Sequence, residues 1–360
     1  MFSLSIKVLS IKVLSIKVLS IKVLFIKEFF FLSVVILHYV MYNKLKLKVI
    51  SKKGYVEGRI MSWELLKDCI LCPRECHVDR TRGQRGYCRV GEELIVARAA
   101  LHLWEEPCIS GEEGSGTVFF SGCSLGCVYC QNVNIARGMA GKIITVERLS
   151  EIFLELSQKG ANNVNLVTPS HYIPQIMDAI LKARSKGFSL PVVYNSSAYE
   201  KAETIRLLEG YIDIYLPDMK YYDSRSAARY SNCGDYFTHA SEAIAEMVRQ
   251  VGFPEFDERG IMKRGVIVRH LLLPGHIADS KKIIEYLYHT YGNTIYISIM
   301  NQYTPLSAMS EYPEINRRVA EEEYEELVDY AIDLGVENGF IQEGETASES
   351  FIPEFNGEGV

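Results

Sequence analysis

The sequence predicts an α/β fold in which six strand–helix units build an open or partial barrel. From Thr117 onward, short apolar strands alternate with longer segments that carry an apolar stripe at helical spacing. The strands are almost continuously apolar, which is typical of a parallel sheet covered by helices. Six units are fewer than the eight of a closed barrel. A doubly wound sheet is the alternative, and in both folds ligands bind at the carboxyl ends of the strands.

Each predicted strand is short and rich in β-branched or aromatic residues. The strands are Thr117–Ser121, Asn163–Thr168, Pro191–Asn195, Ile212–Leu216, Gly265–Leu273 and Thr294–Met300. The helices that follow them are Val146–Gln158, Ile173–Leu181, Lys201–Leu208, Ala243–Val251, Lys281–Tyr291 and Val319–Leu334. The first helix has the clearest pattern, because Leu149, Ile152, Phe153 and Leu156 fall on one face.

Composition separates the first sixty residues from the rest of the 360-residue chain. Residues 1–60 carry eleven Lys and Arg against two Glu, whereas the remainder carries 28 basic against 43 acidic residues. That acidic balance argues against a nucleic-acid-binding surface, so no nucleic-acid partner is expected. Nine cysteines are too few for a disulfide scaffold of this length, and they are clustered.

Residues 1–60 are predicted to be a non-structural extension. Ser-Ile-Lys-Val-Leu occurs four times from Ser5 to Leu24, and a period of five matches neither a helix nor a strand. The apolar run Phe29–Val40 is shorter than the roughly 20 residues that cross a bilayer. A membrane anchor or signal segment is the alternative, but no small-residue cleavage site follows the run. We therefore favour a real start at or near Met61 and expect no membrane partner.

A cysteine-rich loop directly follows the first strand. Its three cysteines lie within eight residues: Cys123, Cys127 and Cys130. A zinc site or a ferredoxin-type cluster would take four protein ligands, so three thiolates leave one iron of a four-iron cluster open to a small molecule. Gly122 and Gly126 let the backbone wrap closely around such a cluster.

The three-then-two spacing, with the aromatic Tyr129 before the last cysteine, resembles the radical S-adenosylmethionine (SAM) superfamily, whose fold is a partial (β/α)6 barrel. The resemblance implies that the three cysteines hold a [4Fe-4S] cluster and that SAM binds its open iron. An electron from the cluster then cleaves SAM, and the 5′-deoxyadenosyl radical abstracts a hydrogen atom from a substrate. A flavodoxin or ferredoxin is the implied electron donor.

Polar residues at the strand ends are predicted to line one cavity, since apolar parallel strands have little reason to end in them otherwise. They are Asn165, Thr168, His171, Asn195, Ser196, Asp218, Lys220, Arg269, His270 and Gln302. Asp218-Met-Lys220 and Arg269–Gly275 resemble motifs of glycyl-radical-enzyme activases. That resemblance implies a cofactor-binding set of Tyr129, Thr168, Asn195, Asp218, Lys220 and Arg269. The chain departs from those activases at Val167–Ser170, where they have Gly-Gly-Glu-Pro. The resemblance therefore supports the cluster ligands more strongly than the residues that would bind the methionyl amine of SAM.

A second set of four cysteines precedes the barrel: Cys69, Cys72, Cys76 and Cys88. Four ligands would close a metal site, which predicts a structural or electron-relaying centre of either zinc or a second iron–sulfur cluster. The remaining cysteines, Cys108 and Cys233, are predicted to be small buried groups. Glu105–Pro107 is predicted to be a solvated loop, and Glu321–Glu326 a solvated helix face.

The predicted divisions are a 1–60 extension, a small cysteine-rich metal-binding module at 61–112, a radical SAM core at 113–345 and a tail at 346–360. Residues 63–360 resemble a branch that is labelled pyruvate formate-lyase activating enzyme-like. This implies a cytoplasmic enzyme that activates a glycyl radical enzyme. The alternatives are a radical SAM enzyme that modifies a small molecule or another macromolecule, and a non-catalytic iron–sulfur or zinc electron-transfer protein.

Overall fold

The structure is a computed structural model that describes residues 63–305, 309–342 and 353–360. The chain divides into two compact units, residues 1–57 and 58–360, and all described residues belong to the second. The pentapeptide repeat and the apolar run of residues 1–60 therefore lie outside the described residues. Within the described ranges, no helix combines the length and apolar character needed to span a bilayer.

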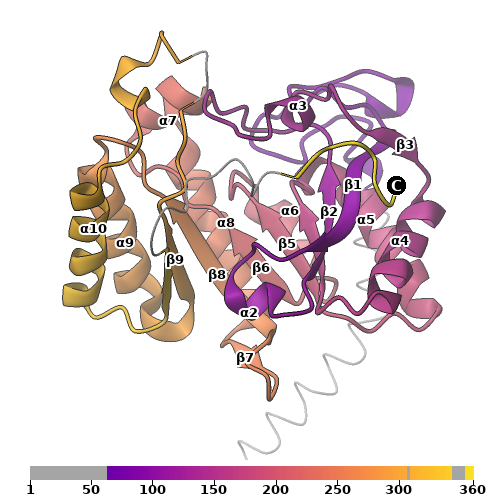
Figure 1. The fold of residues 1–360 in the computed structure, drawn as a ribbon. Helices are drawn as coiled ribbons and strands as arrows, with labels where there is room; N and C mark the ends of the chain where they lie inside the picture. The colour runs from indigo at the N-terminus through magenta and orange to yellow at the C-terminus, as the bar shows by residue number, and fades with distance from the viewer. Residues whose placement is uncertain (1–62, 306–308, 343–352) are drawn as a thin grey trace, which may run out of the picture. The chain divides into compact units, whose positions relative to one another are not determined.

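One curved sheet forms the centre of the described unit (Figure 1), with strand order β10-β9-β8-β6-β5-β4-β2-β1-β3. Seven neighbouring strands are parallel, and the first six correspond to the six predicted strands. They are β2 (Ser115–Phe120), β4 (Val164–Val167), β5 (Val192–Ser196), β6 (Ile214–Pro217), β8 (Met262–Leu271), β9 (Tyr296–Met300) and β10 (Gly339–Ile341). The open parallel sheet confirms the predicted partial barrel.

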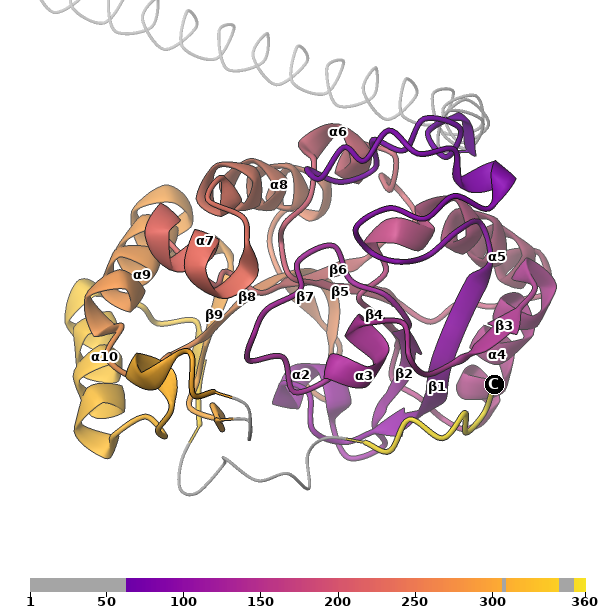
Figure 2. The same ribbon diagram turned by 90° about the horizontal axis from the view of Figure 1, so that it is seen from above.

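The longer helices cover the outer face of this sheet (Figure 2), whereas a doubly wound sheet would carry helices on both faces. They are α4 (Val146–Gln158), α5 (Ile173–Ser185), α8 (Tyr236–Val251), α9 (Ile277–Tyr291) and α10 (Glu321–Leu334). The shorter helices α6 (Ala202–Arg206) and α7 (Ser224–Ser231) pack against α8. The limits of α4 are those predicted, and its apolar stripe is buried. Thr145 caps the helix by accepting a hydrogen bond from the Arg148 amide at 3.1 Å.

Antiparallel strands extend one edge of the parallel sheet, and the sequence did not predict them. Strand β1 (Leu94–His102) pairs with β2, and β3 (Lys142–Ile144) pairs with β1. The segment 353–360 also runs along β1, where the Ala99 amide donates to the Glu358 carbonyl at 2.9 Å. The second half of the predicted cysteine-rich module thus contributes a strand to the main sheet.

A short helix, α2 (Pro107–Ser110), packs against the interior of the barrel. Its Cys108 and Ile109 belong to an apolar cluster with residues of β5, β6 and β8, namely Val193, Ile214, Leu216, Met262 and Ile267. The Asn163 side-chain amide, next to the start of β4, donates to the Ile109 carbonyl at 2.8 Å. Further short elements are α3 (Val133–Ala136) and β7 (Glu255–Phe256). The described residues also contain four short 3₁₀ helices: η1 (Arg80–Arg82), η2 (Ser170–Tyr172), η3 (Gly292–Thr294) and η4 (Pro313–Ile315).

Candidate SAM and iron–sulfur site

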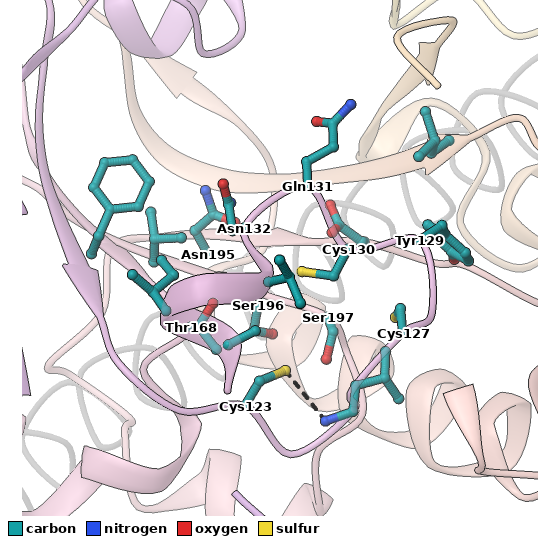
Figure 3. Close-up of a pocket in the computed structure, with 18 of the residues that line it drawn as sticks. Cys123, Cys127, Tyr129, Cys130, Gln131, Asn132, Thr168, Asn195, Ser196 and Ser197 are labelled. Carbon is teal, nitrogen blue, oxygen red and sulfur yellow. Dashed lines mark hydrogen bonds between the residues drawn. The ribbon is translucent and has the colours of Figure 1, made fainter. Parts of the chain in front are cut away.

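A cavity of about 290 Å³ lies at the carboxyl ends of the parallel strands (Figure 3), where ligands bind in barrels of this kind. This volume is at the lower end of the range for small-molecule pockets. The cavity wall contains every residue predicted for the cluster and for the cofactor: Cys123, Cys127, Tyr129, Cys130, Thr168, Asn195, Asp218, Lys220 and Arg269. Residues that are 146 positions apart in the chain therefore share one site.

The three-cysteine loop turns sharply as it leaves β2. Gly122 and Gly126 have φ values of 92° and 75°, which are unfavourable for residues with a side chain. A Cβ at Gly122 would also lie 2.8 Å from the Cys88 carbonyl oxygen. The Gly122 amide donates to the Ile135 carbonyl at 2.7 Å, and the Val128 amide donates to the Tyr230 carbonyl at 2.9 Å. These bonds fix the loop at both ends.

The thiols of this loop are held in a low-polarity environment. Burial raises the pKa of Cys130 to about 12, and it also raises the pKa of Cys127. The Ser231 hydroxyl donates a hydrogen bond to the Cys127 sulfur at 3.0 Å. Without metal these two thiols are protonated at neutral pH, so metal binding must release their protons.

The donor set fits a multi-iron cluster better than a single ion. No three His, Cys, Asp or Glu side chains in the described ranges lie close enough together to bind one metal ion. The three thiols instead surround a cavity, and no fourth cysteine of the described residues lines it. Three soft thiolates around such a space match a [4Fe-4S] cluster with one iron left open.

A buried network of charges lies in the same cavity wall. Arg269 donates to Asp218 Oδ1 at 2.7 Å, to Glu105 Oε2 at 3.0 Å and to Asn195 Oδ1 at 2.7 Å. Lys220 donates to Asp218 Oδ2 at 2.8 Å. Burial alone would raise the pKa of Asp218, but the positive charges of Arg269 and Lys220 outweigh it and hold this pKa below its usual value. The carboxylate is therefore ionised and its orientation is fixed.

The prediction that Glu105–Pro107 is a solvated loop is wrong for its two glutamates, whereas Pro107 is exposed. The side chain of Glu105 is only 9% exposed, and Glu106 is buried as well. Burial raises the pKa of Glu106 to about 7. An acidic pair before a proline gives no local signal of burial. The available signal was the pair Arg269 and Lys220, because two buried cations carry more positive charge than the single carboxylate of Asp218 can balance.

Three of the predicted strand-end residues do not line the cavity. His171 is buried and contacts the Ser121 carbonyl through Nε2 at 2.8 Å. His270 lies between the Met219 carbonyl and the Ser280 hydroxyl. Asn165 lies within β4 and is fully buried. The first two side chains are structural groups that join neighbouring elements, which sequence position alone does not distinguish from site residues.

The second cysteine set lies beside the first. Cys69 and Cys88 are buried, and Cys72 and Cys76 are partly buried. Burial raises the pKa of Cys72, and the neighbouring Cys88, Glu200 and Cys69 raise it further. Side chains of this segment donate hydrogen bonds to the Ser124 and Leu125 carbonyls, so the two cysteine segments are in direct contact. Cys108 and Cys233, outside both sets, are buried as predicted.

The chain belongs to the radical SAM superfamily, whose family model matches residues 117–287. This agrees with the partial barrel and with the cysteine loop after its first parallel strand. Membership implies a [4Fe-4S] cluster and SAM as cofactors, and the residues of the cavity fit both.

The chain is also similar to one curated protein and to solved structures. The chain is 30% identical over 303 residues to Uncharacterized protein MJ0674 of Methanocaldococcus jannaschii. The aligned region covers 82% of this chain and 80% of that protein. Among solved structures, SuiB of Streptococcus suis bound to its precursor peptide SuiA matches with a TM-score of 0.43 and 12% identity, over 62% of this chain and 47% of SuiB. The FeFe-hydrogenase maturase HydG of Carboxydothermus hydrogenoformans matches with a TM-score of 0.38 and 13% identity, over 64% and 58%.

Proposed function

We propose that this protein is a radical SAM enzyme that reductively cleaves SAM at a [4Fe-4S] cluster held by Cys123, Cys127 and Cys130. When bound, the cluster and SAM supply a 5′-deoxyadenosyl radical for hydrogen abstraction. The observation that carries the proposal is that the three thiols and a buried network of charges meet in one cavity at the strand ends.

The residues of the chain bind and orient the cofactor. Lys220 and Asp218 present a cation and an anion of fixed position, which suits the carboxylate and amine of a zwitterionic methionyl group. Asn195 and Arg269 complete the polar wall. Tyr129 packs edge-on against Tyr303 at 5.9 Å between ring centroids and helps exclude water, which protects a radical from side reactions.

The proposed hydrogen donor is a glycine residue of a partner glycyl radical enzyme. Support comes from the Asp218-Met-Lys220 and Arg269–Gly275 motifs, which resemble those of glycyl-radical-enzyme activases. A reduced flavodoxin or ferredoxin in the cytoplasm would supply the electron. We further propose that the second cysteine set binds either zinc or a second iron–sulfur cluster, because four thiolates close a coordination sphere. Its thiols, like those of the first set, would have to move closer together to bind a single zinc ion.

The first test is anaerobic reconstitution with iron and sulfide, followed by reduction and addition of SAM. The wild-type protein should form 5′-deoxyadenosine, measured by liquid chromatography and mass spectrometry. Cys127→Ala should abolish it, because a lost cluster thiolate is not easily replaced. The control Cys108→Ala removes a thiol from the apolar α2 cluster and should retain cleavage. Cleavage by Cys127→Ala would exclude this cluster assignment, and no product from the wild type would favour a non-catalytic iron–sulfur protein.

Two further measurements separate the finer alternatives. A glycyl radical signal in electron paramagnetic resonance (EPR), after mixing with a glycyl radical enzyme, would support activation. If SAM is cleaved but no glycyl radical enzyme that is tested gives such a signal, the substrate would instead be a small molecule or another macromolecule. Metal analysis of the reconstituted protein, compared with Cys72→Ala, identifies the second metal. Cys72→Ala should lose that metal and lower the free energy of unfolding.

A further inference from the structure

Arg74 lies between Cys72 and Cys76 of the second set, yet its hydrogen bonds leave that segment. Its guanidinium donates to the Ser124 carbonyl at 2.9 Å and the Leu125 carbonyl at 3.2 Å. It also donates to the Ser231 carbonyl at 3.0 Å and the Asn232 carbonyl at 2.6 Å. Four hydrogen bonds from one rigid, planar group fix the relative positions of the backbone segments that accept them.

Two aromatic rings hold the guanidinium in this orientation. Its central carbon lies 4.0 Å from the ring centroid of Tyr87 and 5.2 Å from that of Tyr199. Tyr87 comes from the second cysteine segment, directly before Cys88, and its amide donates to the Cys76 sulfur at 3.2 Å. The Tyr87 hydroxyl donates weakly to the Leu125 carbonyl at 3.4 Å. Cation–π contacts of this kind favour one placement of the charge.

The segments joined by Arg74 are those that surround Cys127. Ser124 and Leu125 lie between Cys123 and Cys127, within the cluster-binding loop. Ser231 ends α7, and its hydroxyl is the group that donates to the Cys127 sulfur. Moving Arg74 would therefore change how the loop and this hydroxyl face each other. Hydrogen bonds to cluster sulfurs tune the reduction potential of iron–sulfur centres.

We propose that Arg74 is a positioning residue for the cluster site, and that metal binding at the second cysteine set acts on the first set through it. Cys72 and Cys76 lie on either side of Arg74 in the chain, so a metal that they held would fix the backbone around Arg74. The guanidinium then fixes the loop against Ser231. Occupancy of the second site consequently sets the environment of the Cys127 thiolate and the fit of SAM. The inference rests on the proposed function, since it concerns the same cluster site.

The test compares the reconstituted wild type with Arg74→Gln, Cys72→Ser and the double variant. Arg85→Gln is the matched control, because Arg85 is an exposed arginine of the same segment. The readouts are the EPR spectrum and midpoint potential of the reduced cluster, and the Kd for SAM. Arg74→Gln should alter the spectrum and weaken SAM binding about tenfold or more, whereas Arg85→Gln should match the wild type. The double variant should give the same spectrum and the same Kd as Arg74→Gln, because the loss of Cys72 affects the cluster site only through Arg74.

A second pair of variants covers the case in which Arg74→Gln folds poorly. Tyr87→Leu removes one of the two aromatic rings that contact the Arg74 guanidinium. It should change the EPR spectrum and the Kd for SAM in the same direction as Arg74→Gln, but by a smaller amount. Arg74→Lys keeps the charge but loses the planar fork, so it should rescue only in part. The inference would be overturned by an unchanged EPR spectrum and an unchanged Kd for SAM in these variants, or by additive effects in the double variant. The proposed function would still stand in that case if the wild-type protein cleaved SAM. A wild-type protein with no cluster signal would overturn both.

Discussion

At the scale of single residues, the site depends on how one buried cation is neutralised. Arg269 lies in the interior strand β8 and contacts the side chains of Glu105, Asp218 and Asn195. Lys220 adds a second positive charge next to Asp218. Glu105 and Asp218 together thus place two carboxyl groups against these two cations, and the network holds Asp218 and Lys220 in position for cofactor binding.

Replacement of this carboxylate should destabilise the fold. Glu105→Gln keeps the shape of the side chain but removes the charge that faces Arg269, so we expect a loss of about 1–3 kcal/mol in the free energy of unfolding. The measurement is urea unfolding at pH 8, where ionisation of buried carboxyls is favoured. Glu112→Gln, on an exposed side chain of the following turn, should change stability by less than about 0.5 kcal/mol. Equal effects of the two substitutions would contradict this role for Glu105.

At the scale of elements, the antiparallel edge strand β1 joins the segment 353–360 to the parallel barrel. Strand β1 leads directly into the segment that carries Glu105. The residues 353–360 add a further layer to the edge of β1, where Arg98 forms an ion pair with Glu358 at 2.6 Å. Phe355 packs edge-on against Phe119 of β2 at 5.3 Å, and Pro353 lines the cavity. The last eight residues thereby contribute to the wall of the site.

Removal of the aromatic ring of Phe355 should detach the segment 353–360 from the sheet. Phe355 is half-buried, so Phe355→Ala should cost less than a fully buried phenylalanine, about 1–3 kcal/mol of unfolding free energy. Limited proteolysis should also cut the variant near its C-terminus sooner than the wild type. Glu354→Ala is the control, because its side chain is exposed and only its backbone carbonyl accepts from Arg98. If the protease cut Phe355→Ala at the same rate as the wild type, the ring of Phe355 would not anchor the segment 353–360.

At the scale of the whole molecule, periodicity was sufficient for the parallel core. The strands from Thr117 to Met300 are buried on both faces, so their apolar runs were visible in the sequence. The helix stripe of Leu149 and Phe153 was equally clear. The cysteine spacing and its position after β2 predicted where the cavity would form, because that position follows from the topology of the barrel.

The additions to the core could not be predicted in this way. Strand β1 includes Arg98 and a run of alanines, and it obtains its partners β2 and β3 from the tertiary fold. The burial of Glu105 depends on Arg269, which lies 164 positions away. The contacts of Arg74 likewise depend on carbonyl groups of distant turns. Long-range polar pairing of this kind leaves no local pattern in one sequence.

The metal-free fold should lose stability between weakly acidic and neutral pH because of one buried acid, whose pKa is governed by burial and by hydrogen bonds and not by any charged side chain of the described residues. Glu200, directly after the β5 segment, accepts hydrogen bonds from the hydroxyls of Ser170 and Tyr194 and is fully buried. Burial raises its pKa from 4.5 to about 7. The folded state therefore holds this proton more tightly than the unfolded chain does. Its contribution is complete below pH 4.5 and is lost as the pH rises through 7, by at most about 3 kcal/mol.

Glu200→Gln isolates this contribution, because glutamine stays neutral at every pH while Glu106 and the other acids are unchanged. We expect the wild-type free energy of unfolding, minus that of Glu200→Gln, to fall by up to about 3 kcal/mol from pH 5 to pH 8. Urea unfolding at one-unit intervals measures the difference. Glu203→Gln, on an exposed side chain of α6, should give a difference that does not vary over this range. A flat difference for Glu200→Gln as well would mean that this carboxyl ionises in the folded protein as it does in the unfolded chain, and that the pH dependence arises elsewhere.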